Sequence, residues 1–156
     1  MATKKMAIIA TKGTLDMAYP PFILGSTAAA LGYEVQIFFT FYGLQLLRRD
    51  LSDVKISPLG NPAMPMPVPM PVLVAALPGM ESMATMMMKQ KMKKKGVAPL
   101  EELRALCQEA DVKFIACQMT VDLFDFEKSD FIDGIEFGGA STFMEFAGET
   151  DICLFV

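Results

Sequence analysis

Three cysteines carry most of the chemistry open to this chain of 156 residues. The sequence contains no histidine, which excludes Ser-His-Asp and Cys-His catalysis, a histidine general base and zinc sites built on imidazole. Three cysteines are too few for a disulfide framework, and an odd number leaves at least one thiol unpaired. Because thiolate is the nucleophilic form of cysteine, the surroundings of each thiol decide whether it can react.

Cys117 is the strongest candidate for a reactive thiol. It follows the apolar run at 112–116, a predicted buried strand, and precedes a predicted short helix near 121–126. Amide donors and the dipole at the start of a helix lower the pKa of a nearby thiol, so we expect a thiolate here. The alternative is a buried and inert cysteine, which is the commoner fate of a free thiol.

The other two cysteines are predicted to be structural. Cys107 shares the apolar face of a helix with Leu100 and Leu103, which indicates core packing. That helix runs antiparallel to the following strand, so Cys107 and Cys117 should lie on the order of 15 Å apart, whereas a disulfide needs Cα atoms within about 7 Å. Cys153 lies in the apolar run at 152–156, and we expect it in the core.

Polar residues near the same edge of the sheet could support the thiol, because ligands of parallel α/β sheets bind beyond the carboxyl ends of the strands. The expected strand ends are 11–16, 40–43, 117–122 and 137–140. The candidate supporting residues are Lys12, Asp16, Gln118, Thr120 and Asp122.

Several of these candidates also have plainer interpretations. The loop 11–14 could bind an anion through its amides and Lys12, but it matches no nucleotide-binding pattern and could be a simple turn. Asp16 could cap the following helix rather than act as an acid, and a solvated face explains Asp122. We expect no cofactor. Met64, Met66 and Met70 resemble a soft-ligand set for Cu(I), but without a cysteine or histidine beside them we expect no metal.

Alternating apolar patterns predict the elements that must position these residues. The expected strands are 6–10, 34–40, 112–116, 134–137 and 152–156. The expected helices are 16–31, 43–50, 81–95, one that opens at Pro99, 121–126 and 139–147. This order predicts an α/β fold, a three-layer α/β/α sandwich around a mainly parallel five-stranded sheet. The length fits a single domain over 1–156.

Residues 58–96 form an insertion of unusual composition. Seven of the ten prolines lie between Pro58 and Pro78, and nine of the 14 methionines lie between Met64 and Met92. Residues 62–80 carry no charge, but six of them are proline, so the segment cannot satisfy its backbone as a membrane-spanning helix. We expect an extended apolar arm that packs on the protein or on a neighbouring subunit.

The insertion also concentrates the positive charge. The net charge is −4, and it would be −9 without the five lysines of one short cluster. The cluster consists of Lys89, Lys91, Lys93, Lys94 and Lys95. We interpret it as a partner-binding surface; the alternatives are a solvated helix end and a peripheral contact with membrane. The acidic balance argues against nucleic acid. The first apolar run, 6–10, is too short for a secretory signal, so we expect a cytoplasmic protein with reduced thiols.

The sequence resembles the DsrE/DsrF/DsrH-like sulfur-relay family, in particular its long branch with a proline- and methionine-rich insertion. The matching stretches are 15–24, 35–44, 61–62, 77–80, 84–89, 115–122 and 132–136. The resemblance implies an α/β/α sandwich that forms homo-oligomers in the cytoplasm and carries sulfur as a cysteine persulfide. Cys117 matches the sulfur-carrying cysteine of the family, and Cys107 occupies a place similar to a second cysteine of some relatives. Such proteins are often labelled peroxiredoxins, but residues 114–117 lack the Thr/Ser-x-x-Cys pattern of peroxide reduction.

We therefore expect a sulfur-transfer protein that accepts sulfane sulfur on Cys117 and passes it to an acceptor thiol. Donor and acceptor proteins would be its partners, and whether it acts as an enzyme is left open. The alternative is a non-enzymatic α/β module that binds a partner or a membrane surface through the insertion, with structural cysteines. The two hypotheses differ in thiol reactivity: a carrier has one fast cysteine, and a binding module has three inert ones.

Overall fold

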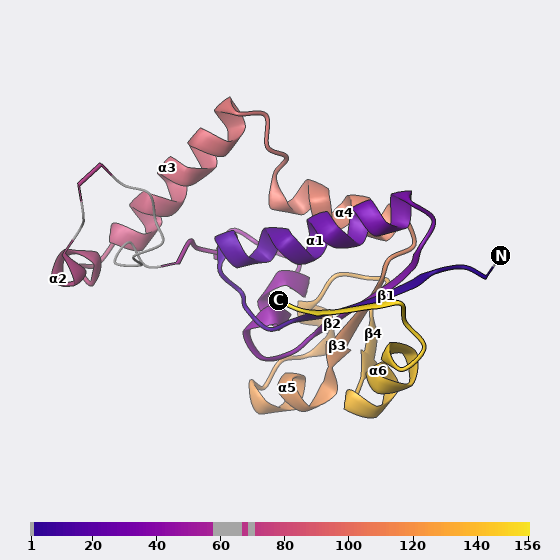
Figure 1. The fold of residues 1–156 in the computed structure, drawn as a ribbon. Coiled ribbons are helices and arrows are strands. Elements are labelled where there is room, and N and C mark those ends of the chain that lie inside the picture. The colour runs from indigo at the N-terminus through magenta and orange to yellow at the C-terminus, as the bar shows by residue number, and fades with distance from the viewer. Residues whose placement is uncertain (1, 58–66, 69–70) are drawn as a thin grey trace.

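A five-stranded parallel sheet organises the computed structural model, which describes residues 2–57, 67–68 and 71–156. The strand order is β4-β3-β2-β1-β5, and every neighbouring pair is parallel (Figure 1). The strands are β1 (Lys5–Ala10), β2 (Glu34–Phe39), β3 (Lys113–Cys117), β4 (Glu136–Gly138) and β5 (Ile152–Phe155). The sheet therefore has the strands that the apolar runs predict, and their carboxyl ends meet at one edge.

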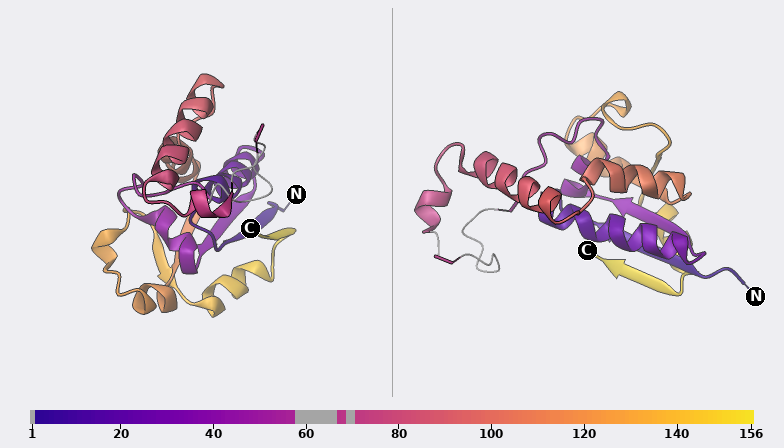
Figure 2. Two further views of the ribbon diagram at one scale, coloured as in Figure 1. Left: turned by 90° about the vertical axis from the view of Figure 1, so that its left-hand side faces the viewer. Right: turned by 90° about the horizontal axis from the view of Figure 1, so that it is seen from above.

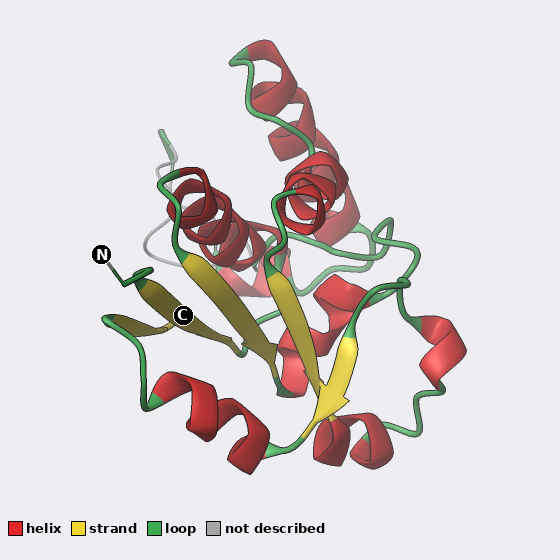
Figure 3. Ribbon diagram, turned by 90° about the vertical axis from the view of Figure 1, so that its right-hand side faces the viewer, coloured by secondary structure: helices red, strands yellow, loops and turns green. Residues whose placement is uncertain are grey.

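Helices cover both faces of this sheet. The long helices α1 (Leu15–Ala30) and α4 (Leu100–Glu109) lie together on one side, while α5 (Gln118–Leu123) and α6 (Ala140–Ala147) lie on the other (Figures 1 and 3). The predicted three-layer α/β/α sandwich is confirmed.

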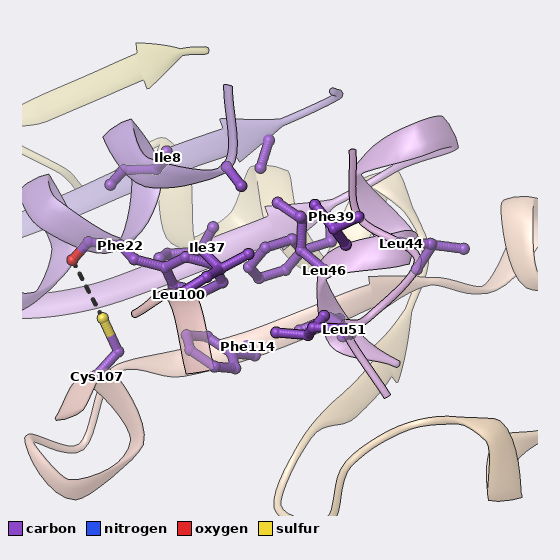
Figure 4. Close-up of a cluster of buried hydrophobic side chains, with 14 of the residues drawn as sticks. Ile8, Phe22, Ile37, Phe39, Leu44, Leu46, Leu51, Leu100, Cys107 and Phe114 are labelled. Carbon is purple, nitrogen blue, oxygen red and sulfur yellow. Dashed lines mark hydrogen bonds between the residues drawn. The ribbon is translucent and has the colours of Figure 1, made fainter. Parts of the chain in front are cut away.

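The larger part of the core lies between the sheet and the pair α1 and α4 (Figure 4). The rings of Phe22, Phe39 and Phe114 pack with centroids 5.3–5.9 Å apart. Because side chains alternate along a strand, the neighbours of Phe39 in β2 and of Phe114 in β3 face the opposite layer. There Phe38 stacks on Phe143 of α6 at 5.0 Å, in a cluster that also contains Cys117.

The segment after β2 differs from its prediction as a helix at 43–50. It forms the 3-10 helix η1 (Phe41–Leu47), and Arg48 is already extended. A 3-10 helix brings residues three apart onto one line, which suits the fully buried pair Leu44 and Leu47. Gly43 packs so closely on the carbonyl of Ala10 that a Cβ would collide with it. A second short 3-10 helix, η2 (Lys128–Asp130), precedes β4.

The described part of the insertion contains α2 (Val72–Ala75) and α3 (Met80–Lys94). Helix α3 projects from the body on the side of α1 and α4 (Figures 1 and 2). It is anchored at Thr85, whose hydroxyl oxygen accepts the Ile56 amide at 3.0 Å. Residues 62–66 and 69–70 of the expected arm, which include the candidate Cu(I) ligands Met64, Met66 and Met70, lie outside the described residues. The described part of the arm is not extended throughout as predicted, because it contains the short helix α2. Within the described ranges, no helix has the length and apolar character needed to cross a membrane.

Candidate functional site

Cys117 ends β3 at the carboxyl edge of the sheet, and α5 begins at the next residue. Helix α5 starts three residues earlier than the helix predicted near 121, so Cys117 is itself the N-cap. Its side chain points into the layer of α6, beside Ile115 and Phe143, and only 4% of the residue is exposed. The thiol therefore lies just below the surface, beneath the first turn of α5.

A pair of threonine hydroxyls lies beside this thiol. Thr40 follows β2 and Thr120 is buried in α5, and their Oγ1 atoms are 3.2 Å apart. The Oγ1 of Thr120 also accepts the amide of Phe41 at 3.1 Å. Thr120 thus ties the loop after β2 to the helix after β3.

The pKa of Cys117 reflects a competition between burial and hydrogen bonding. Burial is the largest single effect and raises the pKa of this thiol. Against it, the hydroxyl and amide of Thr120, the hydroxyl of Thr40 and the amide of Met119 donate to the thiolate. The combined effect of these donors outweighs that of burial, so the pKa of Cys117 lies below its ordinary value. The site therefore favours the nucleophilic form of sulfur.

Phe41 introduces backbone strain next to the threonine pair. Its φ of 47° is in the left-handed region that residues other than glycine rarely adopt. The strained backbone aims the Phe41 amide at Thr120, and the surrounding packing must hold it there.

The structure brings together only some of the predicted supporting residues. Thr120 contacts the thiol. Gln118 and Asp122 instead bond to each other across one helical turn, from Nε2 to Oδ1 at 2.8 Å. Thr40 and Phe41 are additional parts of the site that the sequence did not single out, although both fall within the expected strand end 40–43.

Lys12 and Asp16 line a different part of the same edge, a cavity of about 480 Å³ beside Tyr42 and Ser57. The Asp16 carboxylate accepts the Ser57 amide at 3.0 Å and its hydroxyl at 2.8 Å. Burial, the largest effect, raises the pKa of Asp16, but the bonds from Ser57 and Thr14 outweigh it and lower the pKa below its ordinary value. Asp16 therefore secures the chain that enters the insertion rather than supporting Cys117.

The remaining cysteines behave differently from each other. Cys107 is fully buried and donates to the Phe22 carbonyl at 3.3 Å (Figure 4). Burial raises the pKa of this thiol to about 11. The predicted packing of Cys107 in the core is confirmed. The prediction for Cys153 is wrong: it is exposed. Its strand, β5, is an edge strand whose neighbour in the sheet is β1, and its apolar sequence is left partly uncovered.

The lysine cluster is separate from the thiol site. Its residues extend along the second half of α3 and its C-cap, and all five are exposed. Helix α3 rises on the side of α1 and α4, whereas α5 lies beyond the opposite face (Figure 1). In the part of the chain that the structure describes, no three Cys, Asp or Glu side chains are grouped to hold a metal ion.

Sequence comparison decides the family. The profile of the DsrE/DsrF/DrsH-like family matches residues 2–155. The chain belongs to this family. The resemblance drawn from the motifs is therefore confirmed over nearly the whole chain.

Individual relatives agree with this assignment. "Sulfur carrier protein DsrE2" of Allochromatium vinosum is 69% identical, and the match covers 100% of both chains. "Uncharacterized protein YrkE" of Bacillus subtilis is 33% identical over 99% of this chain and 98% of its own. The crystal structure of the ychN protein from E. coli has a TM-score of 0.57, with 11% identity over 99% of this chain and 100% of its own. That last similarity shows a shared fold.

Proposed function

We propose that this member of the family is a sulfur carrier that holds sulfane sulfur as a persulfide on Cys117. The observation that carries the proposal is the set of hydroxyl and amide donors at Cys117, which lower the pKa of a thiol at the carboxyl edge of the sheet. Support also comes from the 69% identical relative, which is named a sulfur carrier protein.

Loading and unloading are the same exchange run in opposite directions. The Cys117 thiolate attacks the outer sulfur of a donor persulfide, a bond forms between the two sulfurs, and the donor leaves as a thiolate. An acceptor thiolate then attacks the outer sulfur on Cys117, the Cys117–sulfur bond breaks, and Cys117 leaves as a thiolate. Each step exchanges one sulfur–sulfur bond for another, so no external oxidant or reductant is needed.

The donors at Cys117 favour both stages. Thr120 and Thr40 stabilise the thiolate that attacks during loading and that leaves during unloading. A better leaving group accelerates release to the acceptor, because exchange is faster when the departing thiol has a lower pKa. We assign both threonines as positioning residues.

The competing hypothesis is a binding module with structural cysteines. The 69% identical relative does not favour it, and the contrast between Cys117 and Cys107 also speaks against it, because a structural role needs no donors that stabilise a thiolate.

The partners of the carrier are a sulfur donor protein and a sulfur acceptor protein. We place the exchange in the cytoplasm, because persulfide transfer needs reduced thiols. We further propose that the insertion joins copies of the chain into a homo-oligomer, and that the lysine cluster contributes to docking a partner or a membrane surface. The exposed methionines of α3 and the exposed lysines at its end support these assignments.

The proposal is tested by mass spectrometry after incubating the reduced protein with a persulfide donor. We expect mass gains in steps of one sulfur, mapped to the peptide that contains Cys117. Cys117→Ser should abolish loading, whereas Cys153→Ser, which removes an exposed thiol, should load normally. Loading of Cys107 or Cys153 first, or normal loading of Cys117→Ser, would contradict the proposal.

A further inference from the structure

We propose that the surface around Cys117 docks an acceptor protein whose cysteine lies in an apolar segment flanked by lysine or arginine. This inference rests on the proposed function and adds the chemistry of the partner. The surface, called the collar below, consists of the side chains of Phe41, Tyr42, Met119 and Leu123.

The collar is apolar and open to solvent. Phe41 is 44% exposed, Tyr42 65%, Met119 60% and Leu123 57%. Met119 and Leu123 are four residues apart and share one face of α5, the helix that covers the thiol. Exposed apolar side chains gathered at one place mark interaction sites on soluble proteins.

The collar is also held in a fixed arrangement. Tyr42 stacks on Phe124 with centroids 6.2 Å apart, and Phe41 meets the same ring edge-on at 6.5 Å. The Phe41 amide is bound to Thr120, which links the collar to the residue that contacts the thiol. A preformed apolar surface loses little conformational entropy when a partner covers it.

Access to the thiol favours a partner that can engage this surface. Because Cys117 is only 4% exposed and is the N-cap of α5, an acceptor has to bring its sulfur close to this helix, which carries Met119 and Leu123 of the collar. A small thiol has little apolar surface to bury against those side chains, whereas an apolar segment of a protein buries much more and gains binding energy in proportion.

The charge beside the collar indicates what should flank that segment. Asp122, Asp125 and Glu127 are exposed, and residues 114–127 contain no basic side chain. Lys12 lines the cavity beside Tyr42, but it shares that cavity with the Asp16 carboxylate. The guanidinium of Arg48 lies over the ring of Phe126 at 5.6 Å. A partner with lysine or arginine around its apolar segment complements these carboxylates and is steered toward them.

The same charges argue against a second copy of this chain as the acceptor. Cys107 is buried, and the exposed Cys153 follows closely after Glu149 and Asp151. Bringing Cys153 of another copy to the collar would place carboxylates against carboxylates.

The test uses the full chain, loaded with persulfide, and two synthetic peptides of equal length. Each peptide carries one cysteine between leucines; one is flanked by lysines and the other by glutamates. We expect sulfur transfer to the lysine peptide to be about tenfold faster at low salt, with the difference shrinking toward equality at high salt because screening weakens steering. Equal rates at low salt, or faster transfer to the glutamate peptide, would overturn the proposal.

A collar variant tests the apolar part of the surface. In Met119→Ser/Leu123→Ser, we expect transfer to the lysine peptide to fall about tenfold relative to transfer to 2-mercaptoethanol. The matched control is Leu106→Ser, an exposed leucine of α4 on the opposite side of the sheet, which should keep the wild-type ratio. A collar variant with the same ratio as this control would contradict the proposal. Sulfur transfer from a loaded copy to an unloaded, isotope-labelled copy of the chain that is faster than transfer to the lysine peptide would also contradict it.

These results separate the docking surface from the proposed function. If Cys117 takes up no sulfur, the carrier function fails before any acceptor is added. If loading and transfer to 2-mercaptoethanol proceed but the two peptides react alike, the carrier function stands and the docking surface is wrong.

Discussion

Thr120 is the residue on which the geometry of the thiol site depends most. Its side-chain oxygen lies 3.1 Å from the Phe41 amide and 3.2 Å from the Thr40 hydroxyl, and its own donors stabilise the Cys117 thiolate. One buried hydroxyl therefore serves both the stability of the loop after β2 and the chemistry of the thiol.

Thr120→Val should weaken both functions. It removes a donor to the thiolate, so the pKa of Cys117 should rise. The pH profile of its reaction with iodoacetamide should then shift to higher pH. It also leaves the Phe41 amide without its acceptor, which should lower the free energy of unfolding by about 1–2 kcal/mol. Thr120→Ser keeps the hydroxyl and should retain the wild-type pH profile. Identical profiles for Val and wild type would show that the hydroxyl does not act on the thiol.

At this scale the sequence allows part of the site to be predicted. The position of Cys117 at a strand end follows from the apolar run before it, and the structure agrees; its role as sulfur carrier stays a prediction. The partnership of Thr40 with Thr120 could not be predicted, because it joins residues 80 positions apart through the pairing of β2 with β3. The strain at Phe41 likewise follows from tertiary packing.

Among the elements, η1 is held in place by a buried charged side chain. The guanidinium of Arg104, in α4, is buried and donates to the carbonyls of Leu46 and Arg48 at 2.9 and 2.6 Å. The Arg104 side chain of α4 thus provides a hydrogen-bond donor for the carbonyls at the end of η1, and it holds in place the 3-10 helix that begins at Phe41.

Arg104→Met should destabilise the fold, because two carbonyls lose their donor in a buried setting. We expect the free energy of unfolding in urea to fall by about 2–4 kcal/mol. The control is Arg49→Met, which removes an exposed ion pair with Asp133 and an exposed hydrogen bond to the Ser129 carbonyl, and should cost less than about 1 kcal/mol. Equal losses in the two variants would contradict a special role for Arg104.

Element patterns were most reliable where both faces of a strand are covered. The central strands β1, β2 and β3 are apolar and buried, as predicted. The same pattern in β5 led to a wrong prediction for Cys153, since apolar sequence indicates burial only where another layer lies over the strand. Likewise, the leucines at 44 and 47 indicated a helix but could not distinguish a 3-10 helix from an α-helix.

For the whole molecule, the insertion is expected to determine the assembly in solution, because its described helices expose apolar side chains. Met83 and Met87 of α3 are 45% and 63% exposed, and Leu73 of α2 is 85% exposed. Apolar surface of this kind is costly to leave in water and is normally covered by a partner.

We expect the protein to sediment as a homo-oligomer at micromolar concentration. Met83→Asp/Met87→Asp should shift it toward the monomer, because the charged side chains would have to be buried without partners. Leu31→Asp, at a leucine that is 73% exposed on the body, should leave the assembly unchanged. A wild-type protein that sediments as a monomer would contradict the prediction.

The placement of the three thiols also determines how long a bound sulfur would survive. Cys107 packs on one face of the sheet and Cys117 on the other. Cys153 is three strand spacings from β3, about 14 Å. A neighbouring thiol is what discharges a persulfide as free sulfide, and none of the chain's own thiols can reach Cys117 within one subunit. The persulfide on Cys117 would therefore be lost only by reaction with thiols of other molecules, and its lifetime would depend on their concentration.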